Sequence, residues 1–150
     1  MNVNVKIYTE FNHEHGLPVY ETEGAAAMDV RANASVVLQP KETKLIPTGI
    51  YVAIPEGYAL NVLPRSGMSL KTALRVTNAP GLCDSDYRGE INIIAQNTHG
   101  SVEMHIAKGE RIAQLRLVEV PKVVWEPVNS KEELGSTERG AGAFGSTGGH

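Results

Sequence analysis

Short runs in which every second residue is apolar recur along the first 120 positions of the chain. Gly, Pro, Asn and Asp separate these runs, at a spacing of roughly ten residues. A period of two is typical of strands that bury one face. The pattern predicts strands at residues 3–7, 50–54, 60–62, 102–106 and 113–117.

In residues 91–96 apolar side chains occur at odd and at even positions, so they fall on both faces of a strand. This predicts a strand that is buried on both faces. Residues 68–74 form the one window with a helical pattern, and it is long enough for one or two turns. Many short strands with hardly any helix predict an all-β chain: a single-domain, jelly-roll-like β-sandwich or barrel with one short helix. A length of 150 residues agrees with one domain.

The strand pattern stops at Asn129, and the residues that follow are small and polar. Five of the 15 glycines lie between Gly140 and His150, so this end is too small and flexible to pack as a core strand. We therefore expect a β-domain at residues 1–128 and a flexible C-terminal arm at 129–150.

Charge and apolar content exclude several classes of function. Fourteen Lys and Arg oppose 17 Asp and Glu, and no basic block stands out, so a nucleic-acid polymer is a poor partner whereas small anions remain possible. The N-terminus lacks the pattern of a secretory signal, and no apolar stretch is long enough to span a membrane. We expect a soluble, cytoplasmic protein, in which the single cysteine, Cys83, is a buried structural thiol.

The densest polar cluster lies at residues 81–90, directly before the apolar run at 91–96. Asp84 and Asp86 are two positions apart, so in an extended backbone both carboxylates point to one face. Such a pair can position a water or bind a divalent cation. The alternative is a plain turn, because Asp, Ser and Gly are turn formers.

Two other segments have both a chemical and a structural interpretation. Residues 64–67, Pro-Arg-Ser-Gly, can form a phosphate cradle, or Ser66 can be a helix N-cap with Arg65 in solvent. The glycine-rich end can close over an anionic aromatic ligand through Arg139, Phe144 and neighbouring hydroxyls, or it can be a disordered terminus. It is not a dinucleotide fingerprint, because no buried strand precedes it. His13 and His15 are expected to be surface loop residues.

Taken in order, five segments resemble the five motifs of the trimeric dUTP nucleotidohydrolase (dUTPase) family. Motifs three and five are highly specific, and the resemblance covers the chain from about Ala25 to Gly148. The five segments are residues 26–30 (AAMDV), 64–67 (PRSG), 81–90 (GLCDSDYRGE), 109–115 (GERIAQL) and 139–148 (RGAGAFGSTG).

The resemblance implies hydrolysis of dUTP to dUMP and pyrophosphate, which keeps uracil out of DNA and supplies dUMP for thymidylate synthesis. It implies Mg²⁺ held by the three phosphates and water rather than by direct protein ligands. Asp84 matches the carboxylate that orients and deprotonates the water attacking the α-phosphorus. Asp29 matches a position associated with the water network around the metal, so its role is indirect.

The same resemblance implies a set of substrate-binding residues and a shared site. Tyr87 packs under the deoxyribose, and Asn78, with the hairpin that ends at Gly81, reads uracil. Each site is assembled from three subunits of a homotrimer, with motif five supplied by the third. Phosphate contacts fall on Arg65, Ser66, Gly67, Gln114, Arg139, Ser146 and Thr147, while Phe144, next to Gly145, stacks over uracil.

Three positions depart from the family pattern: Ala27 and Ala143 replace glycines, and Cys83 replaces Ile or Val. If either glycine position requires a positive φ, alanine there costs about 1 kcal/mol. Two alternatives share the fold: a dCTP deaminase-related enzyme, and a non-catalytic nucleotide-binding regulatory module. The first is disfavoured by the sequence of motif three, and the second by the complete catalytic set.

Overall fold

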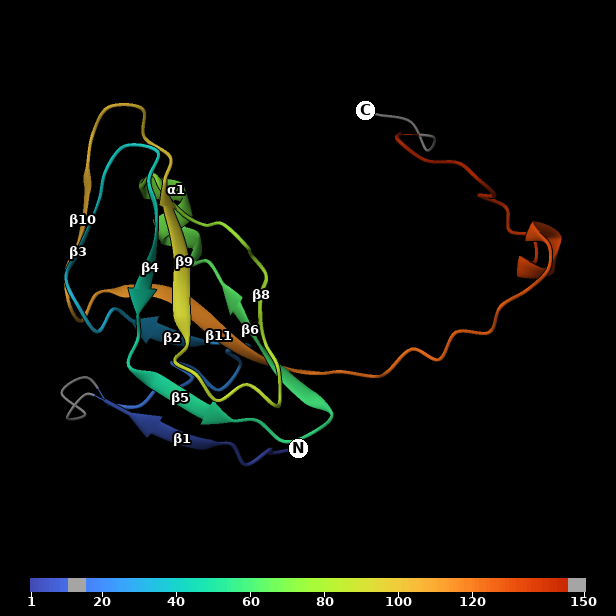
Figure 1. Ribbon diagram of the computed structural model, residues 1–150, viewed down its shortest axis with the longest axis horizontal. Helices are drawn as coiled ribbons and strands as arrows, with labels where there is room; N and C mark the ends of the chain where they lie inside the picture. The colour runs from blue at the N-terminus through green and yellow to red at the C-terminus, as the bar shows by residue number, and fades with distance from the viewer. Residues whose placement is uncertain (11–15, 146–150) are drawn as a thin grey trace.

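The body of the molecule is built from antiparallel β-strands (Figure 1). The computed structural model describes residues 1–10 and 16–145. Within these residues the strands form four small sheets with one α-helix, which confirms the all-β prediction. The strands are β1 (Lys6–Thr9), β2 (Met28–Arg31), β3 (Val36–Leu38), β4 (Thr43–Pro47), β5 (Ile50–Ala53), β6 (Tyr58–Leu63), β7 (Leu74–Val76), β8 (Gly81–Cys83), β9 (Asn92–Asn97), β10 (Met104–Ile106) and β11 (Arg111–Glu119).

The two larger sheets share one aliphatic core. Their strand orders are β2-β11-β6-β8 and β4-β9-β7, and the pairs β1-β5 and β10-β3 complete the sandwich (Figure 1). Branched side chains such as Val30 of β2, Ile46 of β4 and Leu115 of β11 are at most 2% exposed and belong to a single buried cluster. Each contributes about 1.5–3 kcal/mol through burial, so aromatic residues are not needed in the core.

The strands predicted at 50–54, 60–62, 91–96, 102–106 and 113–117 are confirmed as β5, β6, β9, β10 and β11. The run at 3–7 becomes a strand only from Lys6, although Val5 packs against the core. The expected burial of both faces of 91–96 is wrong. Ile93 and Ala95 are fully buried, whereas Ile94 on the opposite face is only half-buried, because that face lines a cavity.

The single α-helix, α1 (Ser66–Lys71), begins two residues before the predicted window 68–74 and ends three residues before its end. Its N-cap is Arg65, which has extended backbone and no side-chain capping bond. The interpretation of Ser66 as an N-cap is therefore wrong, since Ser66 is the first helical residue. The helix stops early because Leu74, 2% exposed, enters β7 and pairs with β9.

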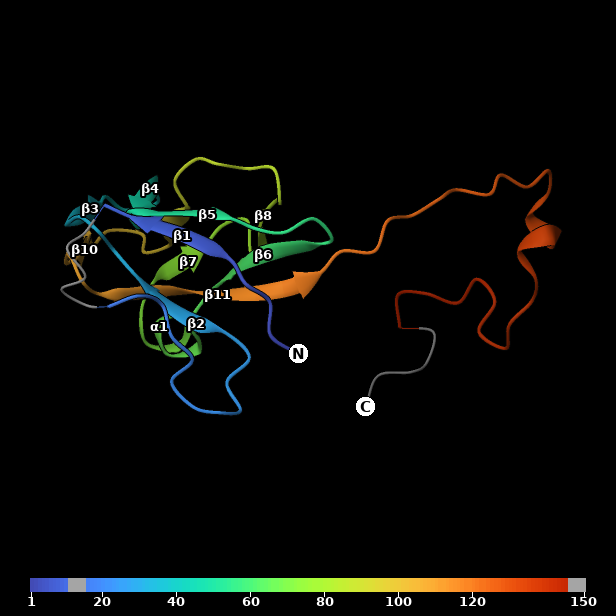
Figure 2. The same cartoon turned by 90° about the horizontal axis from the view of Figure 1, so that it is seen from below.

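After β11 the chain leaves the body (Figures 1 and 2). The N–H of Val120 still donates to the carbonyl of Gly57 (2.8 Å). We call residues 121–145 the C-terminal extension; its described hydrogen bonds are local, and nearly all of it is exposed. It contains a 3-10 turn, η1 (Lys131–Leu134), that the sequence pattern did not indicate. In the described part of the chain, no helix is long and apolar enough to cross a membrane.

Candidate active site

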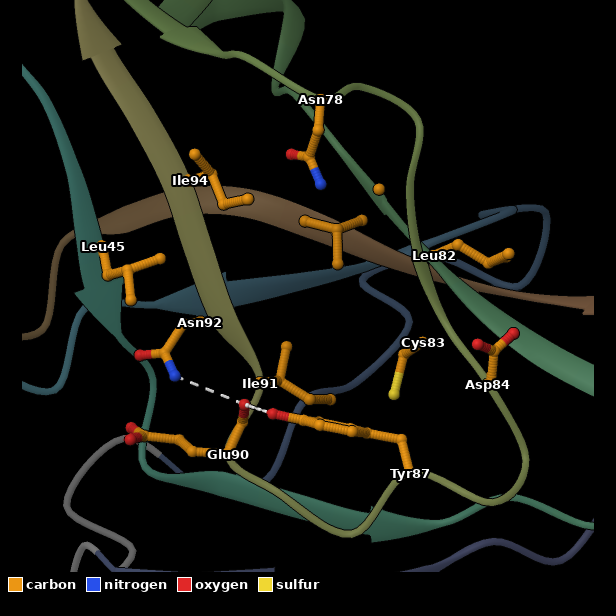
Figure 3. A pocket seen from close by; sticks show the side chains of 12 residues that line it. Leu45, Asn78, Leu82, Cys83, Asp84, Tyr87, Glu90, Ile91, Asn92 and Ile94 are labelled. Atoms are coloured by element: carbon orange, nitrogen blue, oxygen red, sulfur yellow. Dashed lines mark hydrogen bonds between the residues drawn. The ribbon is translucent and has the colours of Figure 1, made fainter.

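The described surface contains a cavity of about 310 Å³ beside β8 and β9 (Figure 3). It joins the edge of the four-stranded sheet to one face of the three-stranded sheet. Its volume is at the lower end of the range found for small-molecule sites. The lining residues are Leu45, Val62, Asn78, Gly81, Leu82, Cys83, Asp84, Tyr87, Glu90, Ile91, Asn92 and Ile94.

Strand β8 offers main-chain groups to this cavity. It is the last strand of its sheet and pairs through Gly81–Cys83 with β6 on one side only, within the residues that the structure describes. A Cβ atom at Gly81 would lie 3.0 Å from Cβ of Val62 and 3.1 Å from Nδ2 of Asn78. Glycine thus lets the Asn78 amide approach the strand, which brings the two predicted base-reading elements together.

Asp84 follows β8 and opens a turn, closed by the N–H of Tyr87 donating to the Asp84 carbonyl (3.2 Å). The turn interpretation is therefore confirmed: the backbone here is a turn rather than the extended strand assumed for the pair, although both aspartates line one groove. Asp84 and Asp86 both line a neighbouring groove with Tyr58 and Lys122, but only Asp84 also lines the cavity. Of the two carboxylates, Asp84 is the one placed to act on a ligand in the cavity.

Tyr87 forms one wall of the cavity, and its position is fixed at the hydroxyl (Figure 3). The hydroxyl donates to the main-chain carbonyl of Glu90 (2.9 Å), which also accepts from Nδ2 of Asn92 (3.3 Å). The Glu90 carboxylate in turn accepts from the N–H of Gly49 (2.8 Å). Glu90 and Asn92 are site residues that the sequence analysis did not identify.

Cys83 lies against this cavity as a free thiol that is 6% exposed. Burial, and secondarily the nearby Asp84 carboxylate, raises the pKa of the thiol above its ordinary value. A raised pKa leaves little thiolate at neutral pH, so the residue is a poor nucleophile. The expectation of a buried structural cysteine is confirmed.

A second polar cluster surrounds Asp29 on β2. Its carboxylate, 11% exposed, accepts from Nε of Arg65 (3.0 Å), from a guanidinium nitrogen of Arg111 (3.3 Å) and from Nε2 of Gln114 (3.3 Å). The side chain of Arg65 is 30% exposed, so the interpretation that it lies in solvent is wrong. Three predicted residues from motifs one, two and four thus form one charged network.

Arg111 was not among the predicted site residues. In a regular strand it would face away from Gln114, three positions later. The pairing of β11 with β2 shifts register between Arg111 and Ala113, and this bulge turns both side chains toward Asp29. Arg111 also forms an ion pair with Glu21 (3.6 Å).

The cavity and the Asp29 cluster are separate on one chain. The cavity lining includes Asn78, Gly81, Asp84 and Tyr87 but none of the motif-two or motif-four residues. Ser66 and Gly67 open α1, directly after Arg65. In the C-terminal extension, Nε of Arg139 donates to the carbonyl of Gly142 (2.8 Å), and Phe144 is fully exposed. Ser146, Thr147, His13 and His15 lie outside the described residues.

The two alanine departures do not impose unfavourable backbone conformations. Among the described non-glycine residues, only Lys41 (φ 66°) and Phe144 (φ 52°) have positive φ. Ala27 and Ala143 both avoid that region, so the cost anticipated for alanine there does not arise in this conformation. The positive φ next to Ala143 falls on Phe144 and on Gly145 (φ 92°).

The structure also bears on a metal site. Over residues 1–10 and 16–145, no group of three or more His, Cys, Asp or Glu side chains is arranged to hold a metal ion. The Asp29 carboxylate already accepts hydrogen bonds from two arginines and a glutamine. Asp84 makes no side-chain hydrogen bond or ion pair within the described residues, so its oxygens are open to water.

Comparison with known proteins identifies the family. The model of the dUTPase family matches residues 13–148. A deoxyuridine 5′-triphosphate nucleotidohydrolase from Desulfotalea psychrophila is 51% identical over 134 residues, which are 88% of this chain and 87% of that protein. One from Fusobacterium nucleatum is 47% identical over 148 residues, or 97% of each chain.

The fold agrees with this relationship. The dUTPase of Staphylococcus bacteriophage 80alpha, solved with dUpNHpp, superposes with a TM-score of 0.85 at 28% identity. The match covers 98% of this chain and 99% of that one. With the family model spanning nearly the whole length and curated relatives near 50% identity, the chain belongs to the dUTPase family.

Proposed function

We propose that this protein hydrolyses dUTP to dUMP and pyrophosphate, keeping uracil out of DNA and supplying dUMP for thymidylate synthesis. The observation that carries the proposal is the cavity at β8, where an open carboxylate, an anchored aromatic ring and an unpaired strand edge meet. The related phage dUTPase solved with dUpNHpp shares this fold. The activity belongs in the cytoplasm, where deoxynucleotides are consumed.

The cavity suits a uracil base and a deoxyribose. Strand β8 and Asn78 line the cavity, and their main-chain and amide groups bind uracil as a base-pair partner would. A site built on buried hydrogen bonds rejects cytosine by leaving its own groups unpaired, and close packing rejects the thymine methyl. The Tyr87 ring packs against the sugar, where a ribose 2′-hydroxyl would collide with the ring or lack a hydrogen-bond partner. Ribonucleotides are therefore excluded.

Asp84 acts as the general base of the reaction. Its carboxylate holds a water in line with the leaving pyrophosphate and takes the proton as the water oxygen bonds to the α-phosphorus. The α-phosphorus–oxygen bond to pyrophosphate then breaks, and dUMP remains. The absence of competing side-chain partners within the described residues supports this role, because a carboxylate held by cations would be a weaker acceptor.

The Asp29 cluster binds the phosphates. Arg65, Ser66, Gly67 and Gln114 make these contacts, and Asp29 orients Arg65 and Gln114 through the bonds described above. Since its oxygens are already occupied by cationic and amide donors, Asp29 is a positioning residue rather than a catalytic one. It would face a metal only through water.

Mg²⁺ is the expected cofactor, and the residues present fit it as a phosphate-bound ion. Mg²⁺ prefers phosphate oxygens and waters to an all-protein cage, and the described residues offer no such cage. When bound, it neutralises charge on the triphosphate. Asp84 and Asp29 are the carboxylates that would approach its water shell.

The complete site requires a homotrimer. On one chain the base-binding cavity and the Asp29 cluster share no lining residue, and the C-terminal extension contacts neither within the described residues. A second copy supplies the phosphate-binding face, and the arm of a third covers the nucleotide. Arg139 then reaches the γ-phosphate, Phe144 stacks over uracil beside Gly145, and Ser146 and Thr147 add phosphate contacts.

Pyrophosphate release with Mg²⁺ across dUTP, dTTP, dCTP and UTP tests the proposal. We expect turnover of dUTP, with kcat/KM for the other three lower by at least about a hundredfold. Ammonia release from dCTP would instead indicate a deaminase-related enzyme. Nucleotide binding without turnover of any of the four would indicate a regulatory module.

A matched pair of variants tests the role of Asp84. Asp84→Asn removes the base but little binding surface, so kcat falls by about a thousandfold or more while dUMP still binds. Asp86→Asn removes the same charge two residues away and leaves kcat within about threefold, because Asp86 lines the neighbouring groove. Equal losses in both variants would overturn the assignment.

A further inference from the structure

Gly89 lies in the segment that closes the cavity but does not itself line it. A Cβ atom at this position would lie 2.6 Å from Cζ and 3.0 Å from Cε2 of Tyr87, and closer still to the hydroxyl oxygen. Ordinary contacts of a Cβ begin at 3.4 Å. The difference between 3.4 and 2.6 Å means that any side chain at 89 displaces the ring by roughly 0.8 Å.

The displaced partner is the ring rather than the main chain. Gly89 has no positive φ, so its backbone accepts alanine. Glu90, next in sequence, is held at its carboxylate by the Gly49 N–H, and the Ile91 N–H donates to the Ile50 carbonyl (2.8 Å). The backbone on this side is therefore tied to β5 and its preceding turn. A new methyl group has to move the Tyr87 ring.

We propose that Gly89 is a positioning residue for nucleotide binding, whose missing side chain sets how far the Tyr87 ring projects into the sugar side of the cavity. Because Gly89 lies outside the lining, a side chain there presses on the ring from behind. The ring loses its bond to the Glu90 carbonyl and enters the space bounded by Cys83 and Ile91 (Figure 3). This inference rests on the proposed function.

The test measures kcat and KM for dUTP in wild-type protein and in Gly89→Ala. A displacement of almost 1 Å at a binding surface costs on the order of ten- to a hundredfold, and we expect it mainly in KM, because Asp84 is unchanged. Gly100→Ala is the matched control, since a Cβ there has nothing within 4 Å. The control should match wild-type protein in both parameters.

A double-mutant cycle separates positioning of the ring from a general structural effect. In a Tyr87→Ala background the methyl group meets no ring, so Gly89→Ala should change KM by less than about twofold. An equal fold-change in both backgrounds would overturn the inference. So would Gly89→Ala with an unchanged KM in the wild-type background.

The wild-type measurement keeps this inference distinct from the proposed function. Wild-type protein that released no pyrophosphate from dUTP would overturn the function, and the inference with it. Two results in an active wild-type protein would overturn the inference alone. One is an unchanged KM in Gly89→Ala, and the other is an equal fold-change in KM with and without Tyr87.

Discussion

Replacing Asp29 by asparagine tests the charged network on which the phosphate-binding face depends. The change keeps the size of the side chain and one carbonyl oxygen, so an acceptor remains for Arg65 or Gln114. It replaces the other oxygen by an NH₂ group that faces the Arg111 guanidinium. Two arginines then share a nearly buried site in which Glu21, paired with Arg111 (3.6 Å), is the remaining counter-charge.

The magnitude follows from the contacts. A hydrogen bond to a charged group contributes about 1.5–3 kcal/mol, and breaking a buried ion pair costs about 3–5 kcal/mol. Asp29 is 11% exposed, but Arg65 and Arg111 are 30% and 37% exposed, so water recovers part of the loss. We expect about 2–3 kcal/mol of destabilisation, or about 1 M in the urea midpoint.

Urea unfolding at a fixed protomer concentration measures this cost, since stability of an oligomer depends on concentration. Glu42→Gln is the control: Glu42 also pairs with a cation, Lys44 (3.2 Å), but at the surface. Its midpoint should stay close to that of wild-type protein. In parallel, kcat/KM for dUTP should fall by about a hundredfold in Asp29→Asn. An Asp29→Asn midpoint equal to that of Glu42→Gln, with unchanged kcat/KM, would refute the network.

Two further predictions concern the thiol and the arm. Because its pKa is raised, Cys83 should be alkylated by iodoacetamide far more slowly in native protein than in urea, and faster as the pH rises and thiolate forms; a native rate equal to that of free cysteine at pH 8 would contradict this. Deleting residues after Glu138 should lower kcat for dUTP by about a hundredfold or more and leave the urea midpoint of the body unchanged, because residues 139–145 make only local hydrogen bonds. A truncated protein with full activity would rule out a role for the arm.

Alternation of apolar residues located the strands that lie in longer alternating runs, and its failures have a common physical cause. Strands β5, β9 and β11 were recognisable because each carries several aliphatic residues at a period of two. Strands β2, β3, β4, β7 and β8 have three to five residues each, and none carries more than two apolar residues at a period of two. Asp29 in β2 and Gly81 in β8, both proposed site residues, lie in such short strands.

The candidate site was predictable where chemistry is local in sequence. Asp84 and Tyr87 lie three residues apart in one turn, so a single motif located both. The network around Asp29 depends on pairing between residues up to 85 positions apart, and on a bulge that no periodicity indicates. Arg111 was missed for that reason. Gly89 was missed because its contribution is an absent side chain, visible only once the Tyr87 ring is placed.

The topology supports the homotrimer that we propose, because it keeps two parts of the site apart on one chain. Pairing of β11 with both β2 and β6 brings Asp29, Arg65 and Gln114 into contact on one side of the four-stranded sheet. Within the described residues the same sheet ends at β8, which lines the proposed base-binding cavity. On one chain this cavity and the Asp29 cluster share no lining residue. In the proposed homotrimer each is completed by the other from a neighbouring copy, and the exposed C-terminal extension connects the subunits.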